Sequence, residues 1–232
     1  MIELNEVTKI YKQGEEQIAA IDHVSFQFED GKVYALVGKS GAGKSTLLNV
    51  IGTVDCATSG TVCMDGLNLM DMTEKDKTVF RRRNLGFVYQ EFHLLPMLTV
   101  KENILLPFVL EYKKKERKKR FDKKYFENMV NVLEIHALLD RHPAQLSGGQ
   151  QQRVTIARAL INQPKYILAD EPTGNLDSET SRQVMDYLLK SVRVSGGTLL
   201  LVTHDSELAE LADHRVEVKD GKLITLTQEK EG

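Results

Sequence analysis

The feature that most constrains the fold is the octapeptide Gly38–Ser45, which fits the pattern G-x-x-x-x-G-K-S. It follows an apolar strand-like run, Lys32–Val37, and precedes a helical pattern over Thr46–Ile51. Glycines let the backbone turn tightly, so that successive N–H groups point at phosphate oxygens, and the positive end of the following helix adds to this attraction. The order of strand, loop and helix therefore predicts an α/β fold that binds a nucleotide.

Two side chains of this phosphate loop have distinct expected tasks. Lys44 should reach the β- and γ-phosphates, and the hydroxyl of Ser45 should ligate Mg²⁺. A merely glycine-rich turn would leave Lys44 unexplained. A nucleotide with Mg²⁺ is the expected ligand, and the expected nucleotide-binding residues of this segment are Gly38, Lys39, Ser40, Gly41, Ala42, Gly43, Lys44, Ser45 and Thr46.

A second apolar run, Tyr166–Ala169, ends in the carboxylates Asp170 and Glu171. A parallel strand beside the loop strand would deliver Asp170 to the Mg²⁺ shell, usually through a water molecule. Glu171 would then polarise the water that attacks the γ-phosphate. An acidic pair at a strand end is also typical of a helix cap or a surface turn, and Pro172–Gly174 fits that alternative. The phosphate loop upstream favours the metal and base roles.

A third motif, Leu146–Gln150, reads Leu-Ser-Gly-Gly-Gln and comes before a helix-like stretch, Val154–Leu160. Ser-Gly-Gly at the start of a helix offers a hydroxyl and exposed N–H groups to an anion. One nucleotide does not need two such nests from one chain, whereas a dimer can close the second nest of one subunit over the γ-phosphate held by the other. The expected nucleotide contacts here are Ser147, Gly148, Gly149 and Gln150.

The three motifs, in this order, resemble an ABC (ATP-binding cassette) ATPase, and the resemblance extends over essentially the whole chain. It implies an α/β, P-loop NTPase (RecA-like) core with an N-terminal antiparallel β-subdomain and a helical ABC subdomain. The whole chain, residues 1–232, would be one nucleotide-binding domain, with the helical subdomain inserted near residues 91–160.

The resemblance also assigns four single residues. Gln90 matches the glutamine loop, which contributes to Mg²⁺ binding and senses the γ-phosphate, and His204 matches the switch histidine that contacts this phosphate. Asp177 matches the loop that crosses the dimer interface, and Tyr11 matches the aromatic residue that stacks on adenine. From the residues alone, Gln90 would suit a structural role and His204 that of a hydrogen-bonded histidine. Asp177 would suit a helix N-cap, and Tyr11 a surface tyrosine.

The stretches Ala169–Asp177 and Gln90–Pro96 are similar to the branch of MacB-, LolD- and FtsE-type systems and bacitracin-type peptide exporters. That likeness implies an ATP-dependent homodimer that drives a separate integral membrane permease in export of a peptide, drug or lipoprotein. The chain would then be peripheral at the cytoplasmic face of the cell membrane, held there by its membrane subunit. The apolar residues Phe92, Leu94, Leu95 and Met97 are expected at the surface, either as the contact with this partner or as local packing.

Charge and composition separate the competing functions. The 232 residues carry 31 Lys+Arg and 33 Asp+Glu, a net charge of -2, so no specific nucleic acid is expected as a partner. A soluble ABC ATPase acting on DNA or ribosomes, and a cell-division regulatory ABC ATPase, remain alternatives. A P-loop kinase would leave the Leu-Ser-Gly-Gly-Gln motif and His204 without a task. The basic run Lys113–Lys124 is either a solvated face or a contact with an anionic partner.

The remaining patterns set the outline of the fold. Alternating apolar residues predict two N-terminal strands within residues 1–30, with a turn at Gly14–Glu16. Thr198–Thr203 reads as a third buried strand, and Val216–Leu226, with Asp220-Gly221 at its centre, as a hairpin. No apolar run approaches the roughly 20 residues of a membrane-spanning helix. No secretion signal is visible, and Cys56 and Cys63 are expected to be reduced thiols.

Overall fold

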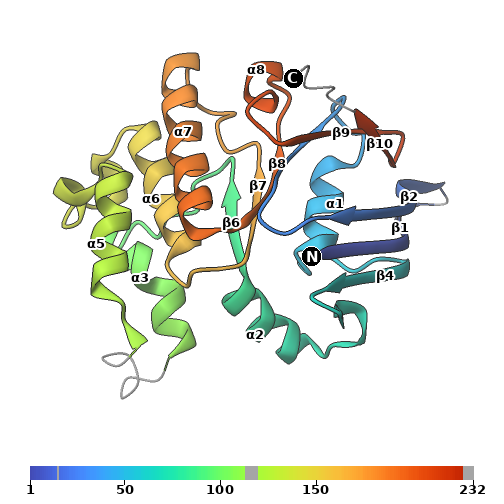
Figure 1. The fold of residues 1–232 in the computed structure, drawn as a ribbon, viewed down its shortest axis with the longest axis horizontal. Helices are drawn as coiled ribbons and strands as arrows, with labels where there is room; N and C mark the ends of the chain where they lie inside the picture. The colour runs from blue at the N-terminus through green and yellow to red at the C-terminus, as the bar shows by residue number, and fades with distance from the viewer. Residues whose placement is uncertain (15, 113–119, 227–232) are drawn as a thin grey trace. The chain divides into compact units, whose positions relative to one another are not determined.

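The structure is a computed structural model that describes residues 1–14, 16–112 and 120–226. The chain divides into two compact units, which are visible in Figure 1. The first unit combines Met1–Arg81 with Thr198–Gly232, and the second is the intervening segment Arg82–Gly197. Most of the basic run from Lys113 lies outside the described residues, and its role stays a prediction.

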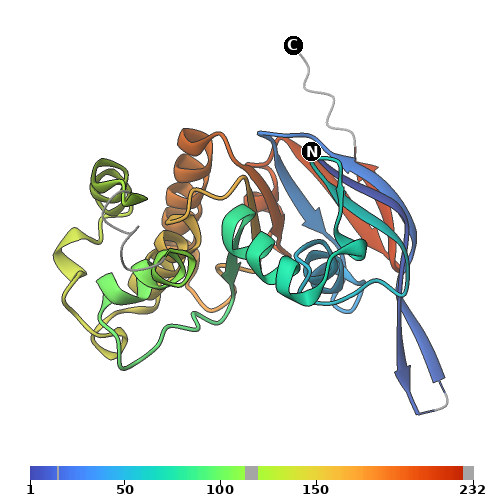
Figure 2. The ribbon, with the colours of Figure 1, turned by 90° about the horizontal axis from the view of Figure 1, so that it is seen from below.

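The first unit contains the expected N-terminal antiparallel sheet, with strand order β2-β1-β4-β5. Its strands are β1 (Ile2–Gln13), β2 (Glu16–Phe28), β4 (Ser59–Met64) and β5 (Leu67–Asn68). β1 pairs with β2 from Ile2–Phe28 at one end to Gln13–Glu16 at the other, and Figure 2 shows how far this hairpin extends. The apolar residues Ile2, Leu4 and Val7 predict one buried face, and all three side chains are buried, with a register shift in the pairing with β2 between Leu4 and Val7.

The same unit holds a parallel group of strands that carries the phosphate loop. β3 (Val33–Val37) lies between β8 (Thr198–Val202) and β9 (His214–Lys219) and runs parallel to both. β10 (Lys222–Leu226) pairs antiparallel with β9 around the turn at Asp220-Gly221, so the predicted terminal hairpin is confirmed. Every residue of β8 is buried, which explains the apolar run Leu199–Val202.

The pairing of β3 corrects one expectation. The sequence predicts that the strand ending in Asp170 lies beside the loop strand. β8 and β9 occupy both edges of β3, so that expectation is wrong. The reason is physical: fully buried parallel strands are apolar throughout, and their sequences carry no signal of which one is the neighbour.

Four short helices complete the description of the segments around these strands. They are α1 (Lys44–Ile51), the 3-10 turn η1 (Leu69–Asp71), α2 (Glu74–Asn84) and α8 (Ser206–Ala209). α1 starts directly at the end of the phosphate loop and buries Leu47, Leu48, Val50 and Ile51. The packing of this helix therefore fixes the end of the loop.

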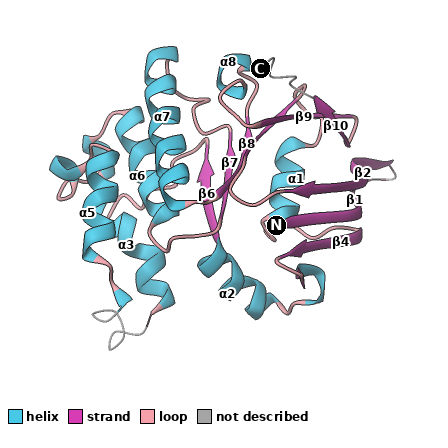
Figure 3. Cartoon of the chain, viewed as in Figure 1, coloured by secondary structure: helices cyan, strands magenta, loops and turns pink. Residues whose placement is uncertain are grey.

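The described part of the second unit is built on two parallel strands and is otherwise mainly helical (Figure 3). β6 (Leu85–Tyr89) pairs with β7 (Tyr166–Asp170). The helices are α3 (Val100–Glu111), α5 (Lys123–Val132), α6 (Gly148–Leu160) and α7 (Ser178–Ser195), with 3-10 turns η2 (His136–Leu138) and η3 (Pro143–Gln145). Among the described residues, no helix is both long and apolar enough to cross a bilayer.

Candidate nucleotide-binding site

The phosphate loop has the backbone that its glycines predict. Gly43 is the N-cap of α1 and adopts φ 103°, in the left-handed region. A Cβ at this position would meet the carbonyl oxygen of Ala20 at 2.1 Å, and a Cβ at Gly38 would meet that of Val218 at 2.2 Å. Only glycine fits at either position. The loop is thus a cradle whose shape depends on residues without side chains.

The N-terminus of α1 suits an anion. Its N-cap, Gly43, has no side chain to accept hydrogen bonds from the first turn, and that turn contains no acidic residue. Backbone N–H groups at a helix start, together with the helix dipole, attract phosphate. Ser45 and Thr46 lie in this first turn. The geometry therefore agrees with the phosphate-binding task expected of Gly38–Thr46.

Lys44 is folded back over its own loop. Its side chain is only 6% exposed, and Nζ donates hydrogen bonds to the carbonyl oxygens of Gly38 at 2.8 Å and Lys39 at 2.9 Å. A buried ammonium held at a glycine-rich loop is a fixed positive charge beside the N–H groups of the loop. Such a charge is suited to a phosphate ligand.

His204 lies at the same edge of the parallel strands as the phosphate loop. Leu36 of β3 pairs with Val202 of β8, so Gly38 and His204 each follow two residues after a paired position. The pairing continues one step further, because the N–H of Thr203 donates to the carbonyl of Leu36 at 3.2 Å. His204 is exposed in the turn before α8. Ligands of α/β proteins bind at this carboxyl edge.

Tyr11 lies on β1 in a small polar cluster. Its hydroxyl donates to Oδ2 of Asp55 at 2.7 Å, and Lys9 Nζ contacts Oδ1 of the same carboxylate at 2.6 Å. Burial and the hydrogen bond to Asp55 raise the pKa of the Tyr11 hydroxyl. Lys9 Nζ lies 4.8 Å from the centroid of the Tyr11 ring, and Tyr11 is 41% exposed. Tyr11 is therefore an oriented, accessible aromatic ring rather than a loosely held surface tyrosine.

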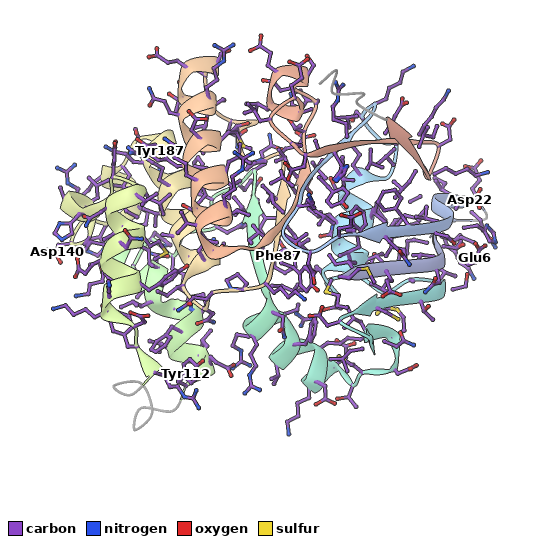
Figure 4. The ribbon with its side chains drawn as sticks, in the orientation of Figure 1. Glu6, Asp22, Phe87, Tyr112, Asp140 and Tyr187 are labelled. Atoms are coloured by element: carbon purple, nitrogen blue, oxygen red, sulfur yellow. The ribbon has the colours of Figure 1, made fainter. Side chains whose placement is uncertain are left out.

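The second unit brings the glutamine and the two carboxylates to one edge. In the pairing of β6 with β7, Tyr89 lies opposite Asp170, so Gln90 and Glu171 follow at the same level. Phe87, labelled in Figure 4, stacks on Tyr89 near the end of β6, with ring centroids 5.6 Å apart. Glu171 adopts φ 45°, an uncommon backbone for a non-glycine residue.

Gln90 has a partner that the sequence did not reveal. Its Nε2 donates to Oδ1 of Asn175 at 3.2 Å, and Nδ2 of Asn175 donates to the backbone carbonyl of Gln90 at 3.1 Å. The sequence signal was weak, because an asparagine after glycine is also typical of an ordinary turn. Asn175 was not among the predicted site residues.

The Leu-Ser-Gly-Gly-Gln motif forms the N-terminus of α6, as predicted. Ser147 is its N-cap, and Oγ accepts a hydrogen bond from the Gln150 N–H at 3.3 Å. Oε1 of Gln150 accepts from the Ser147 N–H at 3.0 Å, which completes a capping box. Gly148 and Gly149 occupy the first turn. A Cβ at Gly149 would meet Cγ2 of Thr180 at 2.5 Å, so this turn packs closely on α7.

Asp177 is a helix N-cap, the alternative that its sequence context also allowed. Its Oδ1 accepts a hydrogen bond from the Thr180 N–H at 3.0 Å at the start of α7. This backbone hydrogen bond lowers the pKa of the Asp177 carboxyl. A role at a dimer interface is compatible with an exposed cap and stays a prediction.

The predicted residues thus belong to two sets. Tyr11, the phosphate loop and His204 lie in the first unit, whereas Gln90, Asp170, Glu171, Ser147 and Asp177 lie in the second. Ser45, Gln90 and Asp170 would offer a hydroxyl, an amide oxygen and a carboxylate. These hard oxygen donors are the kind that Mg²⁺ takes in proteins.

Comparisons with known proteins identify the family. The family described as ABC transporter matches residues 21–174. The dimeric structure of a post-hydrolysis state of the ATP-binding cassette MJ0796, bound to ADP and Pi, superimposes with a TM-score of 0.84 and 41% identity, covering 96% of each chain. MJ0796 comes from Methanocaldococcus jannaschii.

Two named relatives lie within the expected branch. The lipoprotein-releasing system ATP-binding protein LolD of Bordetella pertussis is 40% identical over 215 residues, 93% of this chain and 91% of LolD. The macrolide export ATP-binding/permease protein MacB of Shigella flexneri is 41% identical over 224 residues, 97% of this chain but only 34% of MacB. The predicted fold class and family are confirmed: the chain belongs to the ABC transporter family and is one of its ATP-binding cassettes, an ATPase.

Proposed function

We propose that the chain is the ATP-hydrolysing subunit of an ABC transporter or mechanotransmission complex, in which two copies close around two ATP molecules. The observation that carries this proposal is the pair of anion-binding helix starts, one behind the phosphate loop at Lys44 and one at Ser147. A single nucleotide needs only one of them. The dimeric state of the MJ0796 cassette supports the use of the second start across a dimer. In this proposal residues 1–232 act as one nucleotide-binding domain with the helical subdomain near residues 91–160.

In the proposed site each copy holds ATP with its own loop and closes the partner's site. Tyr11 stacks on the adenine, and Gly38–Thr46 surround the phosphates. Ser147, Gly148, Gly149 and Gln150 of the second copy cover the γ-phosphate, and Asp177 lies at the interface between copies. Because ATP forms part of this interface, nucleotide binding and dimerisation are linked.

The residues present suit Mg²⁺ and hydrolysis. Ser45, Gln90 and Asp170 would hold the ion, the last through a water molecule, and bound Mg²⁺ would supply charge neutralisation at the phosphates. Glu171 accepts the proton of the attacking water, and His204 contacts the γ-phosphate. The protein's share of such a reaction is mainly positioning and charge stabilisation.

The partner is a separate integral membrane permease, and the chain is peripheral at the cytoplasmic face through it. The names of MacB, a macrolide export protein, and LolD, of a lipoprotein-releasing system, support export of a drug, peptide or lipoprotein. The apolar stretch after Gln90 is the proposed contact, since Leu95 is 39% and Met97 70% exposed. No specific nucleic acid is part of this function.

Sedimentation and affinity capture test the proposal together. The purified chain should be mainly monomeric without nucleotide and should form a dimer with ATP. A nucleotide-independent, salt-resistant dimer would contradict the shared site. Capture from detergent-solubilised cells should recover a multi-span membrane protein, whereas recovery of ribosomes or DNA without such a protein would favour a soluble ABC ATPase.

A further inference from the structure

The two hydrogen bonds between Gln90 and Asn175 determine which way the Gln90 amide faces. A backbone carbonyl can only accept a hydrogen bond. The Asn175 atom that faces the Gln90 carbonyl at 3.1 Å is therefore Nδ2, a donor. Its other terminal atom, Oδ1, needs a donor, which is Nε2 of Gln90 at 3.2 Å. Among the described residues, Oε1 of Gln90 accepts no hydrogen bond, and the bond to Asn175 is made by Nε2.

The backbone on the glutamine side of this pair is held independently by α6. Nε2 of Gln152, a residue with no exposed surface, donates to the carbonyl of Tyr89 at 3.1 Å. Two residues beyond Gln90, the carbonyl of Phe92 accepts from Nη2 of Arg158 at 2.8 Å. The main chain on both sides of Gln90 is thus tethered, and the side-chain amide is the part whose orientation is left to be set.

The backbone on the asparagine side is held by consecutive turns. The Gly174 N–H donates to the carbonyl of Glu171, and the Leu176 N–H donates to that of Thr173, both at 3.0 Å. These turns hold the backbone at Asn175 in a defined position relative to Glu171, the proposed base. A Cβ at Gly174 would lie 2.7 Å from Nε2 and 3.0 Å from Cδ of Gln90, so the amide packs directly against this glycine.

We propose that Asn175 is a positioning residue that orients the Gln90 amide with its oxygen available to Mg²⁺. The inference rests on the proposed metal role of Gln90. Only the oxygen of an amide ligates a hard cation, so an amide flipped by 180° would present NH₂ to the metal instead. The Asn175 lock excludes that orientation. It also links the glutamine loop to the segment that runs from Glu171 to Asp177.

The first test detects the lock without nucleotide or metal. Side-chain NH₂ signals of the ¹⁵N-labelled full chain are recorded, and the Gln90 pair is assigned as the signal missing in Gln90→Ala. We expect the wild-type Gln90 NH₂ protons to be separated in shift and slowed in exchange, and to take the values of a solvated amide in Asn175→Ala. Gly174→Ala should have the same effect, because its methyl group displaces the flexible amide. Asn131→Ala, at an exposed position on α5, is the matched control.

The second test is a double-mutant cycle on the Mg²⁺ requirement. The Mg²⁺ concentration that gives half-maximal binding of a fluorescent ATP analogue is measured for wild type, Asn175→Ala, Gln90→Ala and the double variant. Loss of hydrogen bonds of this type corresponds to a rise of about 2- to 12-fold in Asn175→Ala. In the Gln90→Ala background, Asn175→Ala should add no further change, since it acts through Gln90.

The outcomes separate the inference from the proposed function. An unchanged Gln90 NH₂ signal in Asn175→Ala would overturn the lock. The lock would also be overturned if Asn175→Ala raised the Mg²⁺ requirement as much in the Gln90→Ala background as in wild type. If Gln90→Ala itself leaves the Mg²⁺ requirement unchanged, the metal role of Gln90 fails and the metal-directed inference fails with it. The NH₂ signal identifies that case, because the lock is then present without an effect on the metal.

Discussion

Nζ of Lys44 donates a hydrogen bond to the carbonyl oxygen of Gly38 at 2.8 Å, and this bond spans the phosphate loop. The loop itself therefore holds the ammonium group in position. Lys44→Ala should remove the charge that faces the β- and γ-phosphates. Hydrogen bonds to charged groups contribute about 1.5–3 kcal/mol, so we expect ATP affinity to fall about 10- to 150-fold, measured by equilibrium titration. Lys32→Ala, at an exposed position before β3, is the control.

Tyr11 gives a second prediction about ATP binding. Stacking of a base on an aromatic ring contributes about 1–3 kcal/mol, so Tyr11→Ala should weaken ATP binding about tenfold. Tyr11→Phe keeps the ring and loses only the hydrogen bond to Asp55, so its ATP affinity should stay within a few-fold of wild type. Competition with GTP and with triphosphate lacking a base is the direct readout. Equal losses for ATP and for base-free triphosphate would remove Tyr11 as the stacking residue.

A third prediction concerns the permease contact. Asn103 fixes the backbone of Leu95, because its Oδ1 accepts from the Leu95 N–H at 2.8 Å and its Nδ2 donates to the Leu95 carbonyl at 3.1 Å. Leu95→Glu should therefore alter the exposed side chain and leave the loop in place. We expect loss of membrane-subunit capture with retained ATPase activity of the isolated chain. Leu110→Glu, at a 61% exposed position on α3, is the matched control. Normal capture by Leu95→Glu would place the contact elsewhere.

Much of the fold was predictable because its strands are short apolar runs bounded by turn residues. The loop strand, β7, β8 and the terminal hairpin follow from such runs. β4 was not predicted, since it begins with Ser59-Gly60-Thr61 and is a strand through its pairing with β1 and β5. The neighbours of β3 were also out of reach, because contacts between strands distant in sequence leave no local pattern.

The site divides in the same way. The phosphate loop could be predicted from the sequence, because its backbone geometry at Gly38 and Gly43 allows only glycine. Asn175 could not be predicted as a site residue, because its role depends on hydrogen bonds to Gln90, which lies 85 positions away in the sequence. For Asp177 the pattern permitted both a cap and an interface residue, and the hydrogen bond to Thr180 establishes the cap.

The cap at Asp177 gives a prediction about pH. Its pKa in the folded chain is lowered by the Thr180 N–H, so its stabilising contribution is present above the unfolded value of about 3.9 and is lost as pH falls through the lower folded value. Asp177→Asn keeps a capping oxygen without the charge. We expect wild type to be more stable than Asp177→Asn near neutral pH, with the difference vanishing on acidification, as measured by urea unfolding. A pH-independent difference would contradict the charged cap.

The last prediction separates binding from hydrolysis at Glu171. Glu171→Gln has nearly the same shape, so it should keep the φ 45° backbone before Pro172 and still hold a water by hydrogen bonds. It cannot accept a proton as a carboxylate does, and general-base help is worth roughly 10²–10⁴ in rate. We expect ATP turnover to fall at least about a hundredfold while ATP affinity holds.

In the proposed site the same substitution removes a negative charge beside the γ-phosphate, which should ease closure of two highly charged sites. A stable ATP-bound dimer of Glu171→Gln should therefore accumulate in size-exclusion chromatography, whereas Lys44→Ala should stay monomeric because it loses the nucleotide itself. Turnover and elution profile measured side by side for both variants decide the point. Near-normal turnover in Glu171→Gln would exclude this residue as the base and make His204, at the carboxyl edge beside the phosphate loop, the next residue to test.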